Sequence, residues 1–233
     1  MPQNLKQFKA KHPFTSLLLV AIAVRILAVI LLPGYGSNHD IQQDCLIQGF
    51  FDWIKHFDWV KSKMDGDMSW VIMILSRAFY ATVSIFTVLM VYRICDLLAN
   101  DKAKAWNIAL IPTVCVIMPS FGIIDNVSFF LGLPVLLFGS NMVLRQQVLL
   151  DAKQNDKVHR TSYFIAGLML GLSACIWYQS VFAFIAILLM LSVKRDLKGA
   201  LITMLGFVII IVLLFVLLFV LKQNPWDYIH FVK

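Results

Sequence analysis

Seven long apolar runs constrain this chain of 233 residues more than any other feature. In hydrocarbon every backbone N–H and C=O group must be paired internally, so only helices and closed barrels can cross a membrane. The runs lack the strict alternation of barrel strands, and most are long enough to cross most of a ~30 Å hydrocarbon core as helices. We therefore predict an all-α polytopic membrane protein with about seven transmembrane helices. The predicted spans are residues 14–32, 69–92, 105–119, 121–144, 162–178, 181–193 and 200–221.

The distribution of lysine and arginine predicts how these spans are oriented. With a cytoplasmic N-terminus, the cytoplasmic segments carry 13 cations and five aspartates, whereas the external segments carry only five cations. Lysine and arginine are enriched in cytoplasmic loops, which favours this orientation. The first span contains Arg25 and lacks a small-residue cleavage site, so we interpret it as an uncleaved anchor. The predicted inner cations are Lys6, Lys9, Lys11, Arg93, Lys102, Lys104, Arg145, Lys153, Lys157, Arg160, Lys194, Arg195 and Lys198.

This pattern predicts an integral membrane protein of the bacterial plasma membrane, or alternatively of the endoplasmic reticulum. Its basic inner side would face anionic headgroups, and nothing in the sequence indicates nucleic acid. The four cysteines show no Cys-x-x-Cys spacing, so neither a disulfide framework nor a zinc site is predicted.

The external loop 33–68 carries the most informative polar residues. Its first part is rich in turn-forming residues and ends at His39 and Asp40. From Ile41 onward apolar residues recur every three or four positions, which predicts an amphipathic helix. That helix would either lie on the outer leaflet or pack against the spans. Both alternatives place Asp40 at the outer surface of the membrane.

Three ionisable residues lie within the predicted spans: Arg25, Arg77 and Asp125. A charge in hydrocarbon costs at least ~2.5–3.5 kcal/mol, so each should be paired or should face a polar cavity. All three are in the outer halves of their spans, below the loop that carries Asp40 and Asp44. They would either outline one outward-facing site or form an Arg–Asp pair that locks helices together.

The residue types in this region suit group transfer at a membrane surface. A carboxylate there can take a proton from an acceptor hydroxyl, and arginine presents paired donors to phosphate oxygens. Aspartates could also bind a divalent cation, although no metal-ligand set is recognisable. The alternative for Asp40 is a structural role as the cap of the helix that begins near Ile41.

The layout resembles the seven-helix membrane module of the GT-C superfamily, the polyprenyl-phosphate-sugar-dependent glycosyltransferases, and in particular its mannosyltransferase-like branch. The loop motif Asn38-His39-Asp40-Ile41-Gln42-Gln43-Asp44 is similar to that family's acidic motif, with Asp40 in the place of the catalytic acid. The stretch from Gly171 to Ser180 resembles a Gly-Leu…Arg-Tyr-Gln stretch of bacterial members, with Trp177 where the family has arginine. The segment Asn224-Pro225-Trp226-Asp227-Tyr228 resembles the Asn-Pro-x-x-Tyr/Phe stretch after the seventh span of that module.

The resemblance implies transfer of a sugar such as mannose from a polyprenyl-phosphate carrier to a lipid, glycan or protein acceptor at the external or lumenal face. Asp40 would be the general base, and Asp44 would be a second acid that assists it or binds a cation. The implied substrate-binding residues are His39, Arg25, Arg77, Asp125, Tyr178 and Gln179. Family enzymes continue for several more spans, so residues 1–233 would correspond to a single transmembrane module, the N-terminal part of the full fold.

Two other functions remain open from the sequence. A small transporter or lipid flippase would also use buried charges and spans interrupted by glycine and proline, such as Gly132-Leu133-Pro134. A non-catalytic scaffold would need the loop acids only for solvation. An enzyme predicts its polar cluster at the outer surface, whereas a transporter predicts it at mid-membrane.

Overall fold

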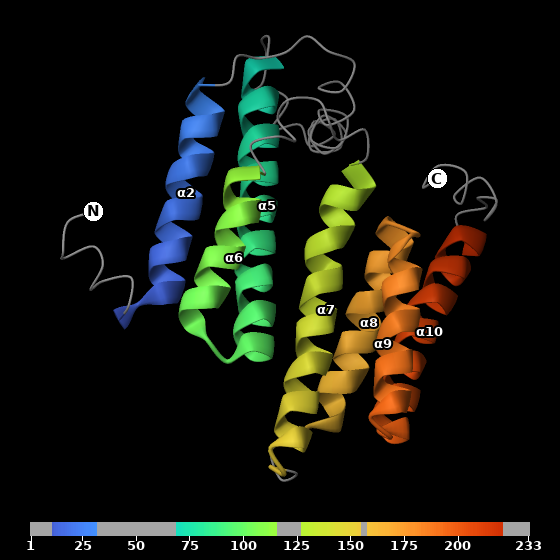
Figure 1. The fold of residues 1–233 in the computed structure, drawn as a ribbon. Helices are drawn as coiled ribbons and strands as arrows, with labels where there is room; N and C mark the ends of the chain where they lie inside the picture. Colours follow the sequence, from blue (N-terminus) through green and yellow to red (C-terminus); the bar gives the residue numbers. More distant parts are fainter. Residues whose placement is uncertain (1–10, 32–68, 116–126, 155–157, 221–233) are drawn as a thin grey trace.

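Seven α-helices make up the computed structural model, which describes residues 11–31, 69–115, 127–154 and 158–220 (Figure 1). Those residues contain no strand, so the predicted all-α class is confirmed for the part of the chain described. Each predicted apolar run corresponds to one helix. The helices are α2 (Pro13–Leu31), α5 (Ser69–Ala99), α6 (Lys102–Cys115), α7 (Val127–Asp151), α8 (Arg160–Ile176), α9 (Ser180–Val193) and α10 (Leu197–Val220).

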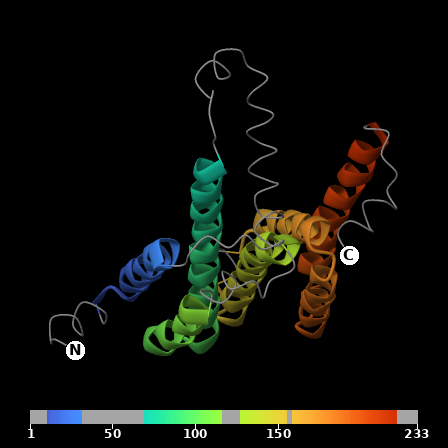
Figure 2. The ribbon, with the colours of Figure 1, turned by 90° about the horizontal axis from the view of Figure 1, so that it is seen from above.

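Successive helices run in opposite directions. The ends of α5, α7 and α9, and the starts of α6, α8 and α10 that follow them, lie at the lower end of Figure 1. Viewed from above, α2, α5 and α6 form one group, and α7, α8, α9 and α10 form a second (Figure 2). The two groups meet where α5 packs against α7.

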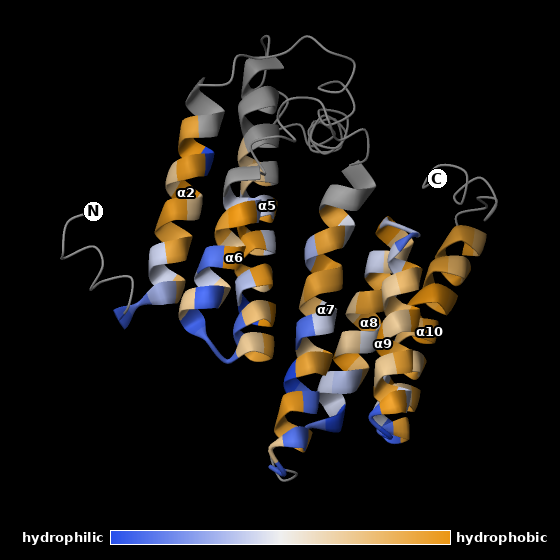
Figure 3. Ribbon diagram, in the orientation of Figure 1, coloured by the Kyte–Doolittle hydropathy of each residue, from blue (hydrophilic) through white to orange (hydrophobic). Residues whose placement is uncertain are grey.

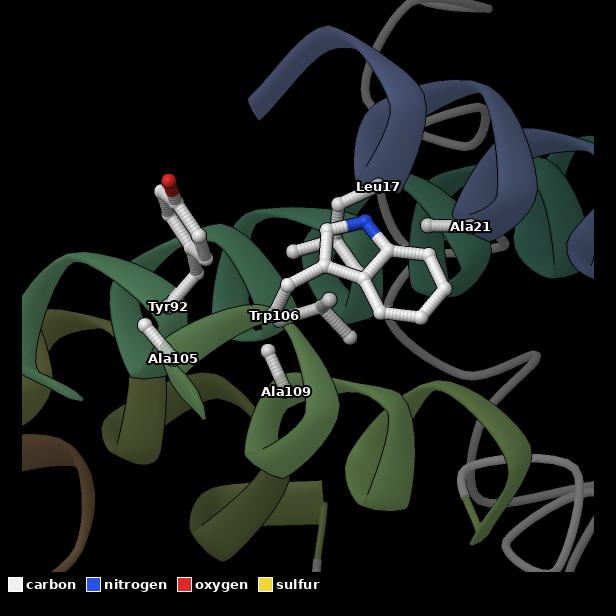
Figure 4. Close-up of a cluster of buried hydrophobic side chains, with 7 residues drawn as sticks. Leu17, Ala21, Tyr92, Ala105, Trp106 and Ala109 are labelled. Carbon is white, nitrogen blue, oxygen red and sulfur yellow. The ribbon is translucent and has the colours of Figure 1, made fainter. Parts of the chain in front are cut away.

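Trp106 of α6 is central to the core of the first group (Figure 4). Its indole lies beside Leu17 and Ala21 of α2. The indole N–H donates to Ser16 Oγ at 3.0 Å, which satisfies the one polar atom of this large apolar side chain. The buried members of this core are Leu17, Ala21, Val88, Tyr92, Ala105, Trp106 and Ala109.

Glycines hold the second group together by letting α8 and α10 approach each other closely. A Cβ atom on Gly167 would lie 2.1 Å from the carbonyl oxygen of Thr203, and one on Gly206 would lie 2.4 Å from that of Phe164. Small residues at such crossings are typical of helix packing in membranes, where hydrophobic association between helices is absent. On its other side α8 packs against α7, where Ser173 Oγ donates to the carbonyl oxygen of Gly132 at 2.9 Å.

Three helical segments are long and apolar enough to cross a membrane: Ala81–Ala99, Leu131–Asp151 and Leu197–Val220. Only 11% of the most apolar stretch of the last segment is buried, and nearly all of its residues are apolar (Figure 3). The apolar segments Pro13–Leu27, Arg160–Ile176 and Ser180–Val193 are shorter. A helix of 14 residues such as α9 reaches ~21 Å, which is less than a ~30 Å hydrocarbon core. Helix length thus identifies three candidate spans among the described residues, compared with the seven predicted.

Charged residues gather at one end of the bundle. Apart from Arg25 and Arg77, every charged residue of the described ranges lies within about two turns of the lower helix ends in Figure 1. Figure 3 shows this end as hydrophilic, below largely apolar helices. We call it the charged end. It contains the same segments that the distribution of lysine and arginine predicts to lie inside.

Candidate functional site

Arg25 is a buried cation inside the first helix group. Its side chain is only 4% exposed, and its three nitrogens donate to groups on two neighbouring helices. Nε donates to Ser84 Oγ of α5 at 2.8 Å. Nη1 donates to the carbonyl oxygen of Thr113 in α6, and Nη2 reaches that of Pro112 at 3.5 Å. The guanidinium therefore joins α2, α5 and α6.

The position of α6 explains why backbone carbonyls can serve as partners. The last four carbonyls of a helix have no intrahelical donor, and those of Pro112 and Thr113 fall in the last turn of α6, which ends at Cys115. The C-terminal end of a helix also carries a partial negative charge that favours a cation. Arg25 thus supplies donors and positive charge where both are needed.

The charge of Arg25 has no carboxylate counterpart in the described part of the chain. Its partners among the described residues are one hydroxyl and two carbonyl oxygens, all neutral. Three of the five N–H groups of a guanidinium are engaged in this way, and the other two have no acceptor among the described residues. Chemically, such a buried cation can receive an anionic oxygen, for which arginine is well suited.

The remaining predicted site residues are placed only in part. Arg77 lies in α5, seven residues before Ser84, but its side chain is outside the described part. Tyr178 and Gln179 lie in the three-residue turn between α8 and α9, at the end opposite the charged end. Both are exposed, and Gln179 Nε2 donates to the Tyr178 hydroxyl at 3.4 Å. None of the contacts described joins this pair to Arg25.

The predicted loop residues lie outside the described ranges. These are His39, Asp40, Asp44 and Asp125, together with the amphipathic helix predicted after Ile41. Within the described ranges no group of three or more histidine, cysteine or acidic side chains is placed to hold a metal ion.

A second polar cluster, at the charged end, is absent from the sequence-based predictions. Asp196 Oδ2 accepts hydrogen bonds from the Tyr163 hydroxyl at 2.6 Å and from Gln147 Nε2 at 2.8 Å. Gln147 Nε2 also donates to the Tyr163 hydroxyl at 2.9 Å. The other oxygen of Asp196 accepts the backbone N–H of Gly199 at 3.0 Å and so caps α10.

The cap was the one part of this cluster that the sequence could have indicated. An aspartate directly before an apolar helix is a common start signal, and Asp196 occupies that position before α10. Its partners Gln147 and Tyr163 come from helices distant in sequence, and no local pattern links them. Their hydrogen bonds hold the α9–α10 turn against α7 and α8.

Comparison of the chain with protein-family models, with curated proteins and with solved structures finds no match.

Proposed function

We propose that all seven helices cross a lipid bilayer, with the charged end in the cytoplasm. Three features support this placement: one helix for each apolar run, alternating directions, and a concentration of lysine and arginine at one end. Of the shorter helices, α8 packs within the second group against α7 and α10, whereas α9 contacts the group along one face and exposes Phe182 and Leu189. Non-helical backbone at membrane depth, which a short helix such as α8 leaves at its ends, is tolerated where protein surrounds it.

On this placement, the function proposed is that of a glycosyltransferase module. It transfers a sugar such as mannose from a polyprenyl-phosphate carrier to a lipid, glycan or protein acceptor at the external or lumenal face. The observation that carries the proposal is the burial of Arg25, a cation without a carboxylate partner among the described residues, in the helix that precedes the sequence segment containing Asp40. The resemblance of that loop to the GT-C acidic motif supplies the reaction class.

In this reaction the carboxylate of Asp40 takes the proton of the acceptor hydroxyl. The acceptor oxygen then bonds to the anomeric carbon of the sugar. The bond from that carbon to the phosphate oxygen breaks, and its electron pair leaves with the polyprenyl phosphate. Arg25 and Arg77 stabilise the negative charge of the phosphate, and Asp44 with His39 assists the base or holds a divalent cation.

The depth of Arg25 supports an enzyme over a transporter or flippase. Arg25 lies six residues before the end of α2, which is about 9 Å along the helix. In a ~30 Å hydrocarbon core this depth is in the outer half. A polyprenyl phosphate at the outer surface could reach it there, whereas a transport site is expected near the bilayer midplane.

The proposal is tested by measuring sugar transfer from a panel of polyprenyl-phosphate sugars in proteoliposomes. The variants are Asp40→Asn, Arg25→Lys and, as a matched control in the same loop, Asp67→Asn. We expect transfer by the wild type and by Asp67→Asn, at least tenfold loss for Arg25→Lys, and no detectable transfer by Asp40→Asn. Transfer that survives Asp40→Asn would remove the proposed base. A wild type that transfers no sugar from any donor would contradict the enzyme class.

A further inference from the structure

Three helices that end at the charged end do so through residues in the left-handed conformation. These are Asn100 after α5 (φ 48°), Lys153 after α7 (φ 56°) and Arg195 after α9 (φ 60°). This conformation suits glycine, and asparagine tolerates it better than most other residues. Lysine and arginine are unusual choices at such positions, so their presence calls for an explanation beyond helix termination.

Backbone hydrogen bonds show why Lys153 and Arg195 adopt the left-handed conformation. At the end of α7 the N–H of Lys153 donates to the carbonyl oxygen of Leu150, and that of Gln154 to Leu149, both at 2.9 Å. The end of α9 repeats this pattern: Arg195 donates to Ser192 at 3.0 Å and Asp196 to Leu191 at 2.9 Å. Both are Schellman motifs, in which glycine is the usual residue at the left-handed position. Glycine would make the same backbone bonds without a charged side chain.

The acidic residues that the structure describes near these two turns, Asp151 and Asp196, are already engaged. Asp151 pairs with Lys194 at 2.7 Å. Asp196 accepts from Tyr163, Gln147 and the N–H of Gly199. Lys153 and Arg195 are exposed and have no ion pair within the described part of the chain.

The cluster formed by Asp196, Tyr163 and Gln147 brings further cations to the same place. Arg195 directly precedes Asp196, and Arg160 lies three residues before Tyr163. Lys153 lies two residues after Asp151, which pairs with Lys194. The Tyr163–Asp196 hydrogen bond and the Asp151–Lys194 ion pair join these segments, so their cations lie on neighbouring segments at one corner of the charged end. Lys198 lies two residues after Asp196. We call this set the cationic corner; it consists of Lys153, Arg160, Arg195 and Lys198, all of them exposed.

We propose that the cationic corner binds the phosphate groups of anionic phospholipids in the adjacent leaflet. This proposal rests on the proposed placement of the helices in a bilayer and does not depend on sugar transfer. Apolar side chains flank the cations: Val193 is 83% exposed and Leu197 is 63% exposed, on either side of Arg195. A phospholipid offers a phosphate for the cations and an acyl chain for this apolar surface, whereas a soluble anion offers only the first.

The test compares thermal stability in two kinds of lipid nanodisc, without any sugar donor. One contains phosphatidylcholine alone, and the other contains about 30 mol% phosphatidylglycerol as the anionic lipid. The main variant is the double substitution Lys153→Gly with Arg195→Gly. Asn100→Gly is the matched control, because it changes the third left-handed residue without removing a charge.

We expect the wild type to have a higher Tm in the anionic discs than in the neutral ones. The double glycine variant should lose at least half of that difference, although its Tm in neutral discs stays the same or rises because glycine suits the left-handed position. Asn100→Gly should keep the full difference. Raising the salt concentration should shrink the difference in the wild type, because exposed charges are screened.

Several results would overturn the proposal. One is a wild type that shows no difference between the discs, and another is a double glycine variant that keeps the whole difference. The same increase produced by inorganic phosphate in neutral discs would identify a soluble anion as the ligand instead. If the glycine variant does not fold, Lys153→Gln with Arg195→Gln replaces it, and retention of the full difference would contradict the proposal equally.

Discussion

At the residue scale, single atoms decide how the helices meet. Gly167 and Gly206 face each other's helix backbone across the α8–α10 contact, with no space for a methyl group. Arg25 acts in the opposite way, since its large charged side chain spans three helices. In a bilayer, close packing and buried hydrogen bonds of these two kinds are the main sources of specific helix association.

The first prediction concerns Gly167→Ala. The new Cβ atom would meet the backbone oxygen of Thr203, which cannot move without separating α8 from α10. We expect a loss of ~1–3 kcal/mol in the free energy of unfolding, the usual range for overpacking. Denaturant unfolding in detergent measures it. Leu205→Ala on the exposed face of α10 is the control and should change stability far less. Equal stability of Gly167→Ala and wild type would show that this contact is looser than described.

The second prediction concerns Ser84→Ala, which removes the acceptor of Arg25 Nε. A hydrogen bond to a charged group contributes ~1.5–3 kcal/mol, so stability should fall by about that amount. Ser192→Ala is a matched control, because its exposed hydroxyl bonds only within its own helix. It should change stability by less than ~0.5 kcal/mol. An equally small loss of stability for Ser84→Ala would mean that the hydrogen bond from Arg25 Nε to Ser84 contributes little to stability.

Sequence reasoning identified Arg25 as a buried charge but did not find its partners. Hydropathy predicts the depth of a residue, and the cost of a charge at that depth predicts that it must be satisfied. The observed acceptors include backbone carbonyls at the end of α6, which carry no signature in the sequence. A side-chain pair with Asp125 was one of two alternatives, and Asp125 lies outside the described residues.

At the element scale, helix ends differ more from prediction than helix centres do. The span predicted to end at residue 92 continues as α5 to Ala99. Arg93, just past the predicted end, lies over the ring of Phe14 with its Cζ atom 5.0 Å from the centroid. A hydropathy pattern reports where the apolar environment ends, whereas a helix continues until its backbone is capped. In α5 that cap is the left-handed Asn100, whose N–H donates to the carbonyl oxygen of Asp96 at 3.0 Å.

The third prediction concerns Asp101, the N-cap of α6. Its Oδ1 accepts the backbone N–H groups of Ala103 and Lys104 at 3.0 and 3.1 Å. The hydrogen bond from the Lys104 N–H, helped by that from Ala103 and by the charge of Lys104, holds the pKa of Asp101 below its ordinary value of 3.8. A carboxyl group whose pKa is lower in the folded state stabilises that state when it is ionised.

The lowered pKa of Asp101 determines how its contribution to stability depends on pH. The stabilisation by Asp101 is fully present above its ordinary pKa and is lost as the pH falls through the lower folded-state pKa. The Tm difference between wild type and Asp101→Ala should therefore stay constant from about pH 7 to about pH 5 and decrease below about pH 4. Thermal unfolding of both proteins at a series of pH values measures this. A difference that grows as the pH falls would contradict the assigned role.

The fourth prediction concerns Tyr163→Phe in the cluster that holds the α9–α10 turn. The substitution removes the 2.6 Å hydrogen bond to Asp196 and a partner of Gln147, with little change in shape. We expect a loss of ~1–3 kcal/mol, because the bond is made to a charged group. Hydrogen exchange should show faster opening of the α9–α10 turn in the variant. An unchanged exchange rate would mean that other contacts hold this turn.

At the scale of the whole molecule, the alternating directions of the helices bring the segments rich in lysine and arginine to the same end of the bundle. The number and order of the helices follow from the seven apolar runs, because apolar length and the need to pair every backbone group are properties of the sequence. The glycine contact between α8 and α10 and the hydrogen bonds of Asp196 could not be predicted in the same way. They depend on which helices become neighbours, and hydropathy gives no information about that.

The proposed membrane orientation is tested most directly by finding on which side of the membrane two turns lie. Single cysteines at Lys153 and at Gln179, in a background without the four native cysteines, can be labelled with a membrane-impermeant thiol reagent in intact cells. Their turns lie at opposite ends of the bundle. The proposed orientation predicts labelling of the Gln179→Cys variant in intact cells, and of the Lys153→Cys variant only after permeabilisation. Labelling of both variants in intact cells, or of Lys153→Cys alone, would contradict it.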